Sequence, residues 1–297
     1  MDRRGQKTAL VLCGGGSRGA LELGFHRALV ELGVPIDFIV GSSVGALNGA
    51  FIAAGESAEK MNALWRSIRF RDLFGLNWRA LVNPRRADSI YGNLRLRHFI
   101  QRYLPAKRFE DLRVPLTILA TDVNTGKGIH LARGDLTEAI LASVVIPGLL
   151  PPVFYQGRQL IDGGVTNNLP LDVAVEKGAT TALAIRCRCE RTRREPVHGI
   201  ANILLRSFDI SDSLKYEQDS HRYDGVCEMI LVTPCFDFDV GFLDFRHSEK
   251  LIDMAYEATI QARDEFTRLI ANRQTPIAAD VRAQISTSVL RKSSKSG

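Results

Sequence analysis

The most constraining feature of the sequence is a serine that stands between an apolar run and a run of small residues. Residues 36–40 are apolar and predict a short buried strand, and residues 46–54 predict a buried helix that ends at Gly55. Between them, Gly41-Ser42-Ser43-Val44-Gly45 places Ser43 at the centre of a G-x-S-x-G motif. A strand, a sharp turn and a helix form the context of a nucleophile elbow, which exposes the serine hydroxyl at a helix N-terminus. The pattern therefore predicts a nucleophile at Ser43.

A motif of this length also arises by chance, because the chain contains 25 glycines. The flanking elements are what separate an elbow from an ordinary turn. At so tight a turn, side chains at Gly41 and Gly45 would collide with the strand or the helix. We therefore interpret residues 41–45 as an elbow.

A second glycine-rich run lies upstream of the elbow. Residues 8–13 predict a strand, Gly14-Gly15-Gly16-Ser17-Arg18-Gly19 follows it, and residues 20–32 show helical spacing of apolar side chains. Three of these glycines also match a dinucleotide-binding G-x-G-x-x-G motif, which requires an acidic residue at the end of the second strand. That strand ends in the serine elbow instead, so we do not favour a nucleotide site.

The glycine-rich run and the elbow can serve one site. If strands 8–13 and 36–40 are parallel neighbours, both turns lie at the same edge of the sheet. The backbone N–H groups near residues 15–17 then face Ser43 and can hold the oxyanion of a tetrahedral intermediate. Glycine suits these positions because side chains would block the substrate carbonyl.

The composition is that of a globular protein with a moderate positive charge. Hydrophobic residues make up 45% of the chain and charged residues 24%, and the formal net charge is +6. The excess of arginine is concentrated in residues 66–113, which suits anionic lipid headgroups or nucleic acid but also describes an ordinary solvated face. Five cysteines without a C-x-x-C pair predict reduced, buried thiols rather than a metal site.

Residues 57–113 contain both tryptophans, Trp65 and Trp78, interleaved with arginines. A basic amphipathic segment can lie on a membrane interface or cover an apolar pocket as a lid. The alternative, an amphipathic helix packed on the core, is at least as good for residues 57–70, whereas a lid is favoured for residues 73–82. Residues 83–113 predict irregular structure.

The rest of the chain alternates predicted strands and helices, including a helix over residues 199–223 and a long one over residues 245–270. This alternation predicts an α/β fold in three α/β/α layers with a mainly parallel sheet. We expect one domain over residues 1–274 and a disordered basic tail over residues 275–297. The longest apolar run, residues 139–155, is interrupted by prolines, so we expect no transmembrane segment. The apolar run that follows Arg3-Arg4, residues 8–13, is only six residues long and leads into glycines, so we expect no signal peptide.

A nucleophilic serine needs a base, and two kinds of candidate are present. His198, His221 and His247 could complete a triad, but each lies in or beside a predicted helix. Asp162 instead follows a short predicted strand and precedes Gly163 and Gly164, which allow another backbone or a substrate to approach closely. A carboxylate held against the hydroxyl can accept its proton directly.

The glycine-rich run, the elbow and Asp162-Gly163-Gly164 resemble, in order and spacing, the motifs of the patatin-like phospholipase family. The compact bacterial members, similar to the catalytic domain of neuropathy target esterase, are the nearest in pattern. The resemblance covers residues 8–190 and includes further matching positions: Thr121, Asp122, Thr125, Gly126, Ala142, Ser143, Ile146, Pro147, Pro151, Pro152, Val153, Asn168 and Pro170. The C-terminal third matches loosely, with Ala255-Tyr256 where the family has Gly-Tyr.

The resemblance implies a Ser–Asp dyad of Ser43 and Asp162, without histidine, metal or cofactor. It assigns the oxyanion hole to the run Gly14, Gly15, Gly16, Ser17, Arg18 and Gly19, with Arg18 bracing the loop or meeting a phosphate. The substrates it implies are phospholipids, lysophospholipids or neutral lipids, with no nucleic acid. We therefore expect a cytoplasmic acyl hydrolase, with peripheral membrane contact through residues 57–113.

Two other functions fit parts of the pattern. A regulatory or adaptor protein could keep the fold with little turnover, although the intact motifs argue against it. An α/β-hydrolase with a Ser-Asp-His triad usually carries its elbow later in the chain, whereas Ser43 follows the second predicted strand. The sequence does not determine the oligomeric state, the headgroup or the acyl chain.

Overall fold

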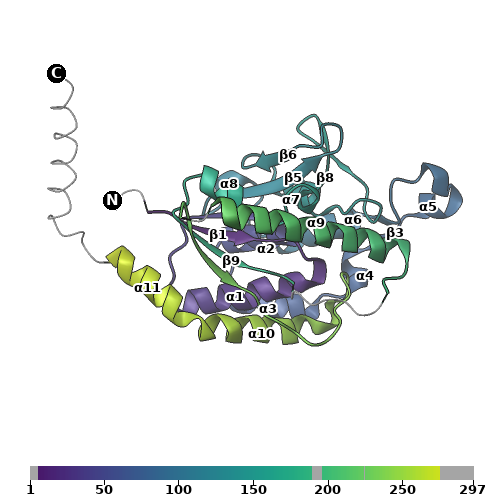
Figure 1. Ribbon diagram of the computed structural model, residues 1–297. Helices are drawn as coiled ribbons and strands as arrows, with labels where there is room; N and C mark the ends of the chain where they lie inside the picture. The colour runs from purple at the N-terminus through teal and green to yellow at the C-terminus, as the bar shows by residue number, and fades with distance from the viewer. Residues whose placement is uncertain (1–5, 189–195, 224, 275–297) are drawn as a thin grey trace, which may run out of the picture.

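The computed structural model describes residues 6–188, 196–223 and 225–274, so the tail expected over residues 275–297 lies outside the described residues. Its centre is an eight-stranded sheet in the order β10-β9-β1-β2-β5-β8-β7, with β6 also paired to β5 (Figure 1). The strands are β1 (Thr8–Leu12), β2 (Phe38–Ser42), β5 (Leu116–Asp122), β6 (Gly128–Leu131), β7 (Val153–Tyr155), β8 (Arg158–Asp162), β9 (Thr181–Ile185) and β10 (Glu228–Val232).

Five strands, from β10 to β5, are parallel neighbours, and β6, β7 and β8 pair antiparallel. The parallel strands β1, β2, β5 and β9 are buried along their whole length, as expected for strands covered on both faces. The α/β fold with a mainly parallel sheet is therefore confirmed. The prediction that strands 8–13 and 36–40 are parallel neighbours is also correct, because β1 pairs with β2.

Helices cover the sheet in two layers. The lower layer in Figure 1 contains α1 (Ala20–Glu31), α3 (Ala58–Ser67) and α10 (Ser248–Gln261), which pack against one another. The upper side carries α8 (Leu171–Glu176) and α9 (Ile200–Arg222). Two further helices pack together beside the elbow, α2 (Val44–Ala53) and α7 (Leu136–Val144), and α6 (Leu94–Tyr103) packs on α7.

The strand register explains how two distant parts of the chain meet. Along β5, Ile118 and Leu119 pair with both β2 and β6, while Ala120 and Thr121 pair with both β6 and β8. A strand has only two edges. One edge of β5 pairs with β6, and the other pairs first with β2, as far as Ser42, and then with β8. The end of β8, Asp162, is thereby brought to the turn that follows β2.

Two predictions about helices need correction. Residues 83–113 are not wholly irregular, since they contain α6; its Leu94-Arg95-Leu96-Arg97 alternation conceals the helical spacing. The long helix over residues 245–270 is two helices, α10 and α11 (Arg263–Gln274), which are separated at Ala262. One turn before this break the Thr259 hydroxyl donates to Ala255 O (2.6 Å), a type of bond that often bends helices.

The cysteines follow the prediction in part. Cys13, Cys187 and Cys227 are free and buried, but Cys235 takes part in a disulfide bond. The spacing of cysteines along a chain cannot show which of them folding brings together, so this bond was not predicted.

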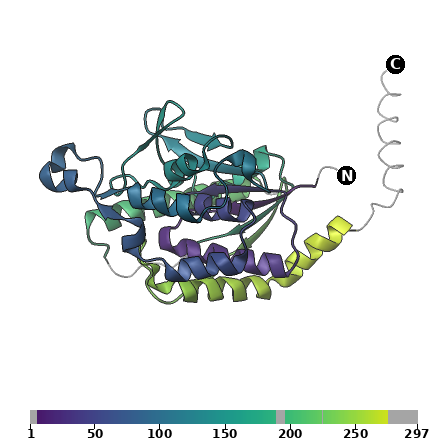
Figure 2. The ribbon, with the colours of Figure 1, turned by 180° about the vertical axis from the view of Figure 1, so that it is seen from behind.

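Residues 57–113 divide into a packed part and a projecting part. Helix α3 packs on α1 and α10, and Trp65 is buried, which agrees with the packed alternative for residues 57–70. The following segment, residues 69–95, which we call the arm, contains α4 (Phe70–Leu73), β3 (Gly75–Leu76), α5 (Trp78–Val82), η3 (Pro84–Arg86) and β4 (Tyr91–Gly92). Helix α5 projects from the body of the molecule in both Figure 1 and Figure 2.

No helix in the described ranges is both long enough and apolar enough to span a membrane.

Candidate active site

Ser43 lies at a strained turn between β2 and α2. Its φ of 55° and ψ of −126° fall where non-glycine residues are rare, which is the signature of a functional constraint. The flanking glycines are required by space. A Cβ on Gly41 would lie 2.4 Å from Gly45 O, and a Cβ on Gly45 would lie 2.5 Å from Leu12 O. The steric reason given for this motif therefore holds in the structure.

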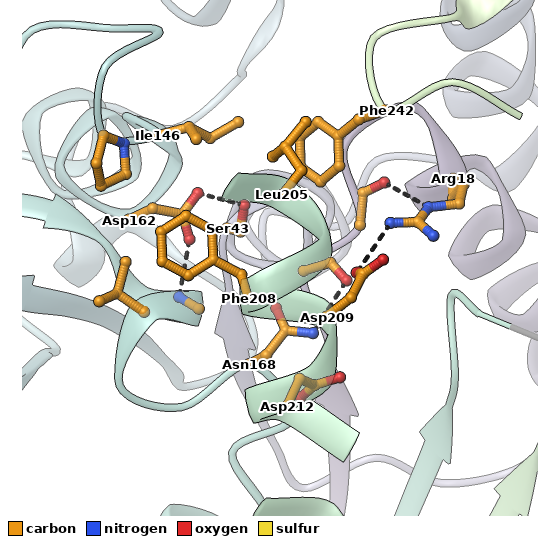
Figure 3. Close-up of a pocket in the computed structure, with 15 residues that line it drawn as sticks. Arg18, Ser43, Ile146, Asp162, Asn168, Leu205, Phe208, Asp209, Asp212 and Phe242 are labelled. Carbon is orange, nitrogen blue, oxygen red and sulfur yellow. Dashed lines mark hydrogen bonds and ion pairs between the residues drawn. The ribbon is translucent and has the colours of Figure 1, made fainter. Parts of the chain in front are cut away.

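The hydroxyl of Ser43 donates to Asp162 Oδ2 at 2.6 Å (Figure 3). The other carboxylate oxygen of Asp162 accepts from the Gly164 amide at 2.8 Å. Both side chains are buried, and burial raises the pKa of Asp162 to about 6, while its two hydrogen bonds oppose that rise. The carboxyl group is therefore mostly ionised at neutral pH but is a stronger base than a solvated aspartate.

A second layer of hydrogen bonds holds this pair in place. The Ser43 amide donates to Ser143 Oγ at 2.9 Å, and the Ser143 hydroxyl donates to Leu119 O on β5. Thr121 Oγ1 donates to the carbonyl oxygen of Asp162 at 2.9 Å. Strand β5 thus positions both the turn that contains Ser43 and the end of β8. Ser143 and Thr121 were part of the sequence resemblance, but nothing in the sequence gave them these roles.

Close packing also explains the two glycines after Asp162. A Cβ on Gly163 would lie 2.3 Å from Leu119 O and 2.7 Å from Ser42 Oγ. A Cβ on Gly164 would lie 2.8 Å from Asn168 Oδ1. These glycines let the turn after β8 approach β5 and the elbow closely enough for the Ser43–Asp162 hydrogen bond.

The glycine-rich loop passes beside Ser43 after β1. Gly14 is held to Asn168 by two hydrogen bonds, from its amide to Asn168 O (3.2 Å) and from Asn168 Nδ2 to its carbonyl (3.3 Å). A Cβ on Gly14 would lie 2.9 Å from the Cβ of Ser43, so only glycine fits here. The amides of Gly15 and Gly16 make no hydrogen bond to another described residue, whereas the Ser17 amide donates to Phe242 O.

Arg18 lies in the short 3-10 helix η2 (Gly16–Gly19) and braces this loop. Its Nε donates to Gly15 O at 3.2 Å, its guanidinium lies 3.5 Å from Asp209 of α9, and it stacks over the Phe242 ring. Gly16 has a φ of 59°, and a Cβ there would lie 2.2 Å from Phe242 O. Arg18 was expected either to brace the loop or to meet a phosphate, and its contacts with Gly15, Asp209 and Phe242 are those of a bracing residue.

Two cavities of different character meet at Ser43. The first, which we call the polar cavity, has a volume of about 50 Å³ and is lined by charged and amide side chains together with apolar ones: Gly14, Gly15, Arg18, Pro147, Asp162, Gly164, Val165, Asn168, Leu205, Phe208, Asp209 and Asp212. The apolar cavity, of about 60 Å³, is lined by aliphatic and aromatic side chains: Val44, Leu47, Trp65, Ile68, Leu73, Phe74, Leu96, Phe99, Val144, Leu243 and Phe245. Ser43, Ile146 and Phe242 line both cavities.

The comparison with known families decides which class of protein this is. The patatin-like phospholipase profile matches residues 10–175, more than half of the chain and all of the elements that carry Ser43, Asp162 and the glycine-rich loop. The chain belongs to the patatin-like phospholipase family.

Patatin-like relatives include long eukaryotic proteins. Human patatin-like phospholipase domain-containing protein 6 is 34% identical over 183 residues, which cover 61% of this chain and 13% of the relative. Lysophospholipase NTE1 of Mycosarcoma maydis is 32% identical over 184 residues, covering 61% of this chain and 10% of the relative. An NTE family protein of Mycobacterium bovis is 28% identical over 302 residues, covering 89% of this chain and 48% of the relative. The chain therefore spans less than half the length of these relatives.

The three histidines that were considered as bases do not lie at the centre of this patatin-like site. His198 and His221 lie beside and on α9, and His247 lies 3.7 Å from Asp244 Oδ2. None of the three lines either of the two cavities. The acceptor of the Ser43 hydroxyl is Asp162 alone.

Within the described ranges, one group of side chains has the donor atoms of a metal site. Cys13 Sγ, Cys187 Sγ and a Glu22 carboxylate oxygen lie within 4.8 Å of one another, buried beneath the glycine-rich loop. Hydrogen bonds already engage them: Cys13 donates to Ile185 O, Cys187 donates to Glu22, and Asn48 donates to Glu22 at 2.8 Å. Burial raises the pKa of Glu22 well above its usual value, which favours a neutral acid, so these donors do not require a cation.

Several residues around the patatin-like site were not predicted from the sequence. Asp209 and Asp212 come from α9, whose helical pattern was recognised but whose position over Ser43 was not. Asp212 bonds to Asn168, and burial raises the pKa of Asp212. Phe242 follows β10 by ten residues, in a segment that carried no motif. One signal was available: acidic residues at 209 and 212, one turn apart, share a helix face with Leu205 and Phe208.

Proposed function

We propose that the protein is a lipid acyl hydrolase of phospholipase A or lysophospholipase type, with Ser43 as nucleophile and Asp162 as general base. The observation that carries this proposal is the 2.6 Å hydrogen bond from Ser43 Oγ to Asp162 Oδ2, at a strained elbow where a polar and an apolar cavity meet. Membership of a phospholipase family and the relative named lysophospholipase NTE1 support a lipid ester as substrate.

Acylation begins when Ser43 Oγ attacks the ester carbonyl and its proton passes to Asp162. The carbonyl oxygen becomes an oxyanion, for which the amides of Gly15 and Gly16 are the available donors in the loop from Gly14 to Gly19. The tetrahedral intermediate then collapses: the bond to the leaving alcohol breaks, and the alcohol oxygen takes the proton from Asp162. The product of this half-reaction is an acyl ester on Ser43 and a free alcohol.

Deacylation repeats the same steps with water. Asp162, ionised again, accepts a proton from water as the water oxygen attacks the acyl carbonyl. The second tetrahedral intermediate releases the fatty acid, and Ser43 Oγ regains a proton from Asp162. A base of pKa about 6 suits both steps, because it is ionised at neutral pH and still holds a proton well enough to return it.

The two cavities suggest how the ester is oriented. Acyl chains are apolar, and burying each methylene gains about 0.8 kcal/mol, so the cavity walled by Trp65, Phe74 and Phe99 suits the fatty acyl chain. The polar cavity, with Arg18, Asp209 and Asn168, suits the hydrogen-bonding alcohol side of a glycerophospholipid or lysophospholipid. Peripheral contact with a membrane from a cytoplasmic location is part of this proposal.

Labelling with a fluorophosphonate probe tests the proposal most directly. We expect wild-type protein to be labelled at Ser43, Ser43→Ala to remain unlabelled, and Asp162→Asn to be labelled far more slowly. The variants His198→Gln, His221→Gln and His247→Gln are the controls and should be labelled like wild type. If folded wild type stays unlabelled even with detergent or liposomes, a regulatory or adaptor role on this fold becomes the better reading.

A further inference from the structure

The arm, residues 69–95, exposes large apolar side chains that the core does not use. Leu76 is 71% exposed, Trp78 66% and Val82 74%, and Ile90 is exposed as well. Trp78 and Val82 belong to α5, which Figures 1 and 2 show standing clear of the sheet and its helices, and Leu76 and Ile90 flank this helix at the attached base of the arm. A cluster of exposed apolar side chains on one element marks an interaction surface rather than ordinary surface variation.

The same segment is strongly basic. It contains six arginines and two aspartates: Arg69, Arg71, Arg79, Arg85, Arg86 and Arg95 against Asp72 and Asp88. The carboxylate of Asp72 is engaged by the backbone amide of Arg69. Neighbouring arginines outside the arm do pair with carboxylates, as in Arg66 with Glu249 and Arg97 with Glu138. Arg71, Arg85 and Arg86 are exposed and form no such ion pair with any described residue, so their charges are available to an external anion.

The base of the arm forms part of the apolar cavity. Leu73 and Phe74 line that cavity together with Ser43, and Phe70, Phe74 and Tyr91 pack as an aromatic cluster beneath the projecting part. The amides of Ile90 and Tyr91 donate to Gly148 O and Leu149 O, directly after Pro147 of the polar cavity. The arm is therefore attached at both ends to the walls of the site.

We propose that the arm is a docking surface for an anionic phospholipid bilayer, with Leu76, Trp78 and Val82 inserted at the boundary of headgroups and acyl chains. Arginines near such a surface are attracted to anionic headgroups, and the adjacent apolar side chains gain from burial in the acyl region. A protein partner would be expected to contact the arginines through carboxylates. A bilayer offers both headgroup phosphates for the arginines and an apolar interior for the exposed apolar side chains. The consequence for catalysis rests on the proposed function: docking places the apolar cavity beside the lipid acyl chains.

Tryptophan fluorescence gives a direct test in the 297-residue chain. The chain has two tryptophans, and Trp65 lines the apolar cavity, where an acyl chain would also change its emission, so the measurement uses Trp65→Phe, in which Trp78 is the one remaining tryptophan. With vesicles of phosphatidylcholine and phosphatidylglycerol we expect a blue shift and quenching by brominated acyl chains. Pure phosphatidylcholine vesicles should give much weaker effects. The absence of both effects with anionic vesicles would overturn the proposal.

Vesicle co-sedimentation with substituted proteins locates the surface. Arg85→Glu with Arg86→Glu should weaken partitioning to anionic vesicles by roughly tenfold or more, since each basic residue near such a surface contributes about a factor of five. Trp78→Ala with Val82→Ala should weaken it severalfold. Matched controls are Arg263→Glu with Arg268→Glu on α11 for charge, and Phe154→Ala on β7 for an exposed apolar side chain. Equal losses in the controls and the arm variants would contradict a docking role for the arm.

Hydrolysis of a short, water-soluble ester separates this proposal from the proposed function. Arm variants should hydrolyse the soluble ester like wild type while losing activity on anionic vesicles, because Ser43 and Asp162 are untouched. If wild type binds anionic vesicles through the arm but hydrolyses no ester, the docking surface stands and the hydrolase proposal fails. If it hydrolyses esters without binding vesicles, the docking surface fails alone. Binding to a protein instead of any vesicle would likewise reject the bilayer as occupant.

Discussion

The two cavities that meet at Ser43 are of similar size but differ in character, because only one of them is lined by charged side chains. The polar cavity contains charged and amide groups that bind one another: Arg18 forms an ion pair with Asp209, and Asn168 is hydrogen-bonded to Asp212. The apolar cavity contains almost no polar atoms other than those of Ser43. Ser43 stands at the boundary, and so do Ile146 and Phe242. Under the proposed function, this difference would separate two tasks: one side would carry the proton transfers and the alcohol, and the other would hold the acyl chain.

This separation makes the consequences of substitution distinguishable. On the polar side, changes to the base or to the oxyanion donors should alter the rate for every ester. Changes on the apolar side should alter which acyl chains are accepted while leaving short esters nearly unaffected. If substitutions on the two sides changed the rates for all esters alike, the two cavities would not have separate roles.

The largest effect is expected for Asp162→Asn. An amide cannot accept the Ser43 proton, and general base catalysis contributes factors of 10² to 10⁴, so kcat/KM should fall on the order of 10³-fold for short and long esters alike. Steady-state rates on an ester series measure this. Asp122→Asn is the matched control, because Asp122 is a buried carboxylate at the end of β5 that pairs with Arg158 instead of Ser43. A similar loss in that control would point to general damage to the sheet rather than to a base.

A smaller loss is expected for Gly14→Ala. The new methyl group would meet Asn168 Oδ1 at 2.1 Å and the Cβ of Ser43 at 2.9 Å, which displaces the glycine-rich loop from the elbow. Losing an oxyanion donor costs 10² to 10³ in kcat, so we expect roughly a 10²-fold fall for all esters. Thermal unfolding checks that the variant is folded. Retained activity in a folded Gly14→Ala protein would remove this loop from the oxyanion hole.

The pH dependence follows from the burial of Asp162, which raises its pKa to about 6. The base must be ionised, so kcat/KM for the free enzyme should rise through pH 6 and level off above pH 7. At pH 5 the rate should be roughly tenfold below the plateau. A profile without a limb near pH 6, for short esters whose chemistry limits the rate, would exclude this carboxyl group as the base.

The same pKa has a consequence for stability with a definite sign. The folded pKa of about 6 lies above the usual value of 3.8, so the folded protein holds this proton more tightly than the unfolded chain does. The free energy of unfolding therefore falls as pH rises from about 4 to about 6 and then changes no further from this group. Denaturant titrations of wild type and Asp162→Asn should differ in this window, and the variant should lack this contribution.

A part of this site could be predicted from the sequence when the residues that form it lie close together along the chain. The elbow and the glycine-rich loop are local: strand, turn and helix lie within about fifteen residues, and the glycines at 41 and 45 are dictated by backbone contacts inside that span. Asp162 was found because Gly163 and Gly164 leave a short signature. The alternation of strands and helices also predicted the parallel centre of the sheet.

The remaining parts depend on contacts between distant segments. Ser143 reaches the elbow amide only because α7 packs on α2, and Phe242 reaches Gly16 only because the segment after β10 folds back over the loop. Neither contact has a periodicity or spacing that a single sequence displays. The disulfide of Cys235 was missed for the same reason.

The smallest but most discriminating effect is expected from one substitution made in each cavity. Leu73→Phe adds volume to the apolar cavity, and Leu205→Phe adds the same volume to the polar cavity, from α9. Since adding or removing a methylene in an apolar pocket changes kcat/KM by tenfold or more, Leu73→Phe should reduce hydrolysis of long-chain esters roughly fivefold relative to butyrate esters. Leu205→Phe should leave that ratio unchanged and instead disfavour esters with bulky alcohols. Chain-length and alcohol series on the same preparations measure both ratios, and unfolding temperatures identify overpacking. If the two variants exchanged their selectivities, the acyl chain would lie in the polar cavity, and the orientation of the substrate at Ser43 would have to be reversed.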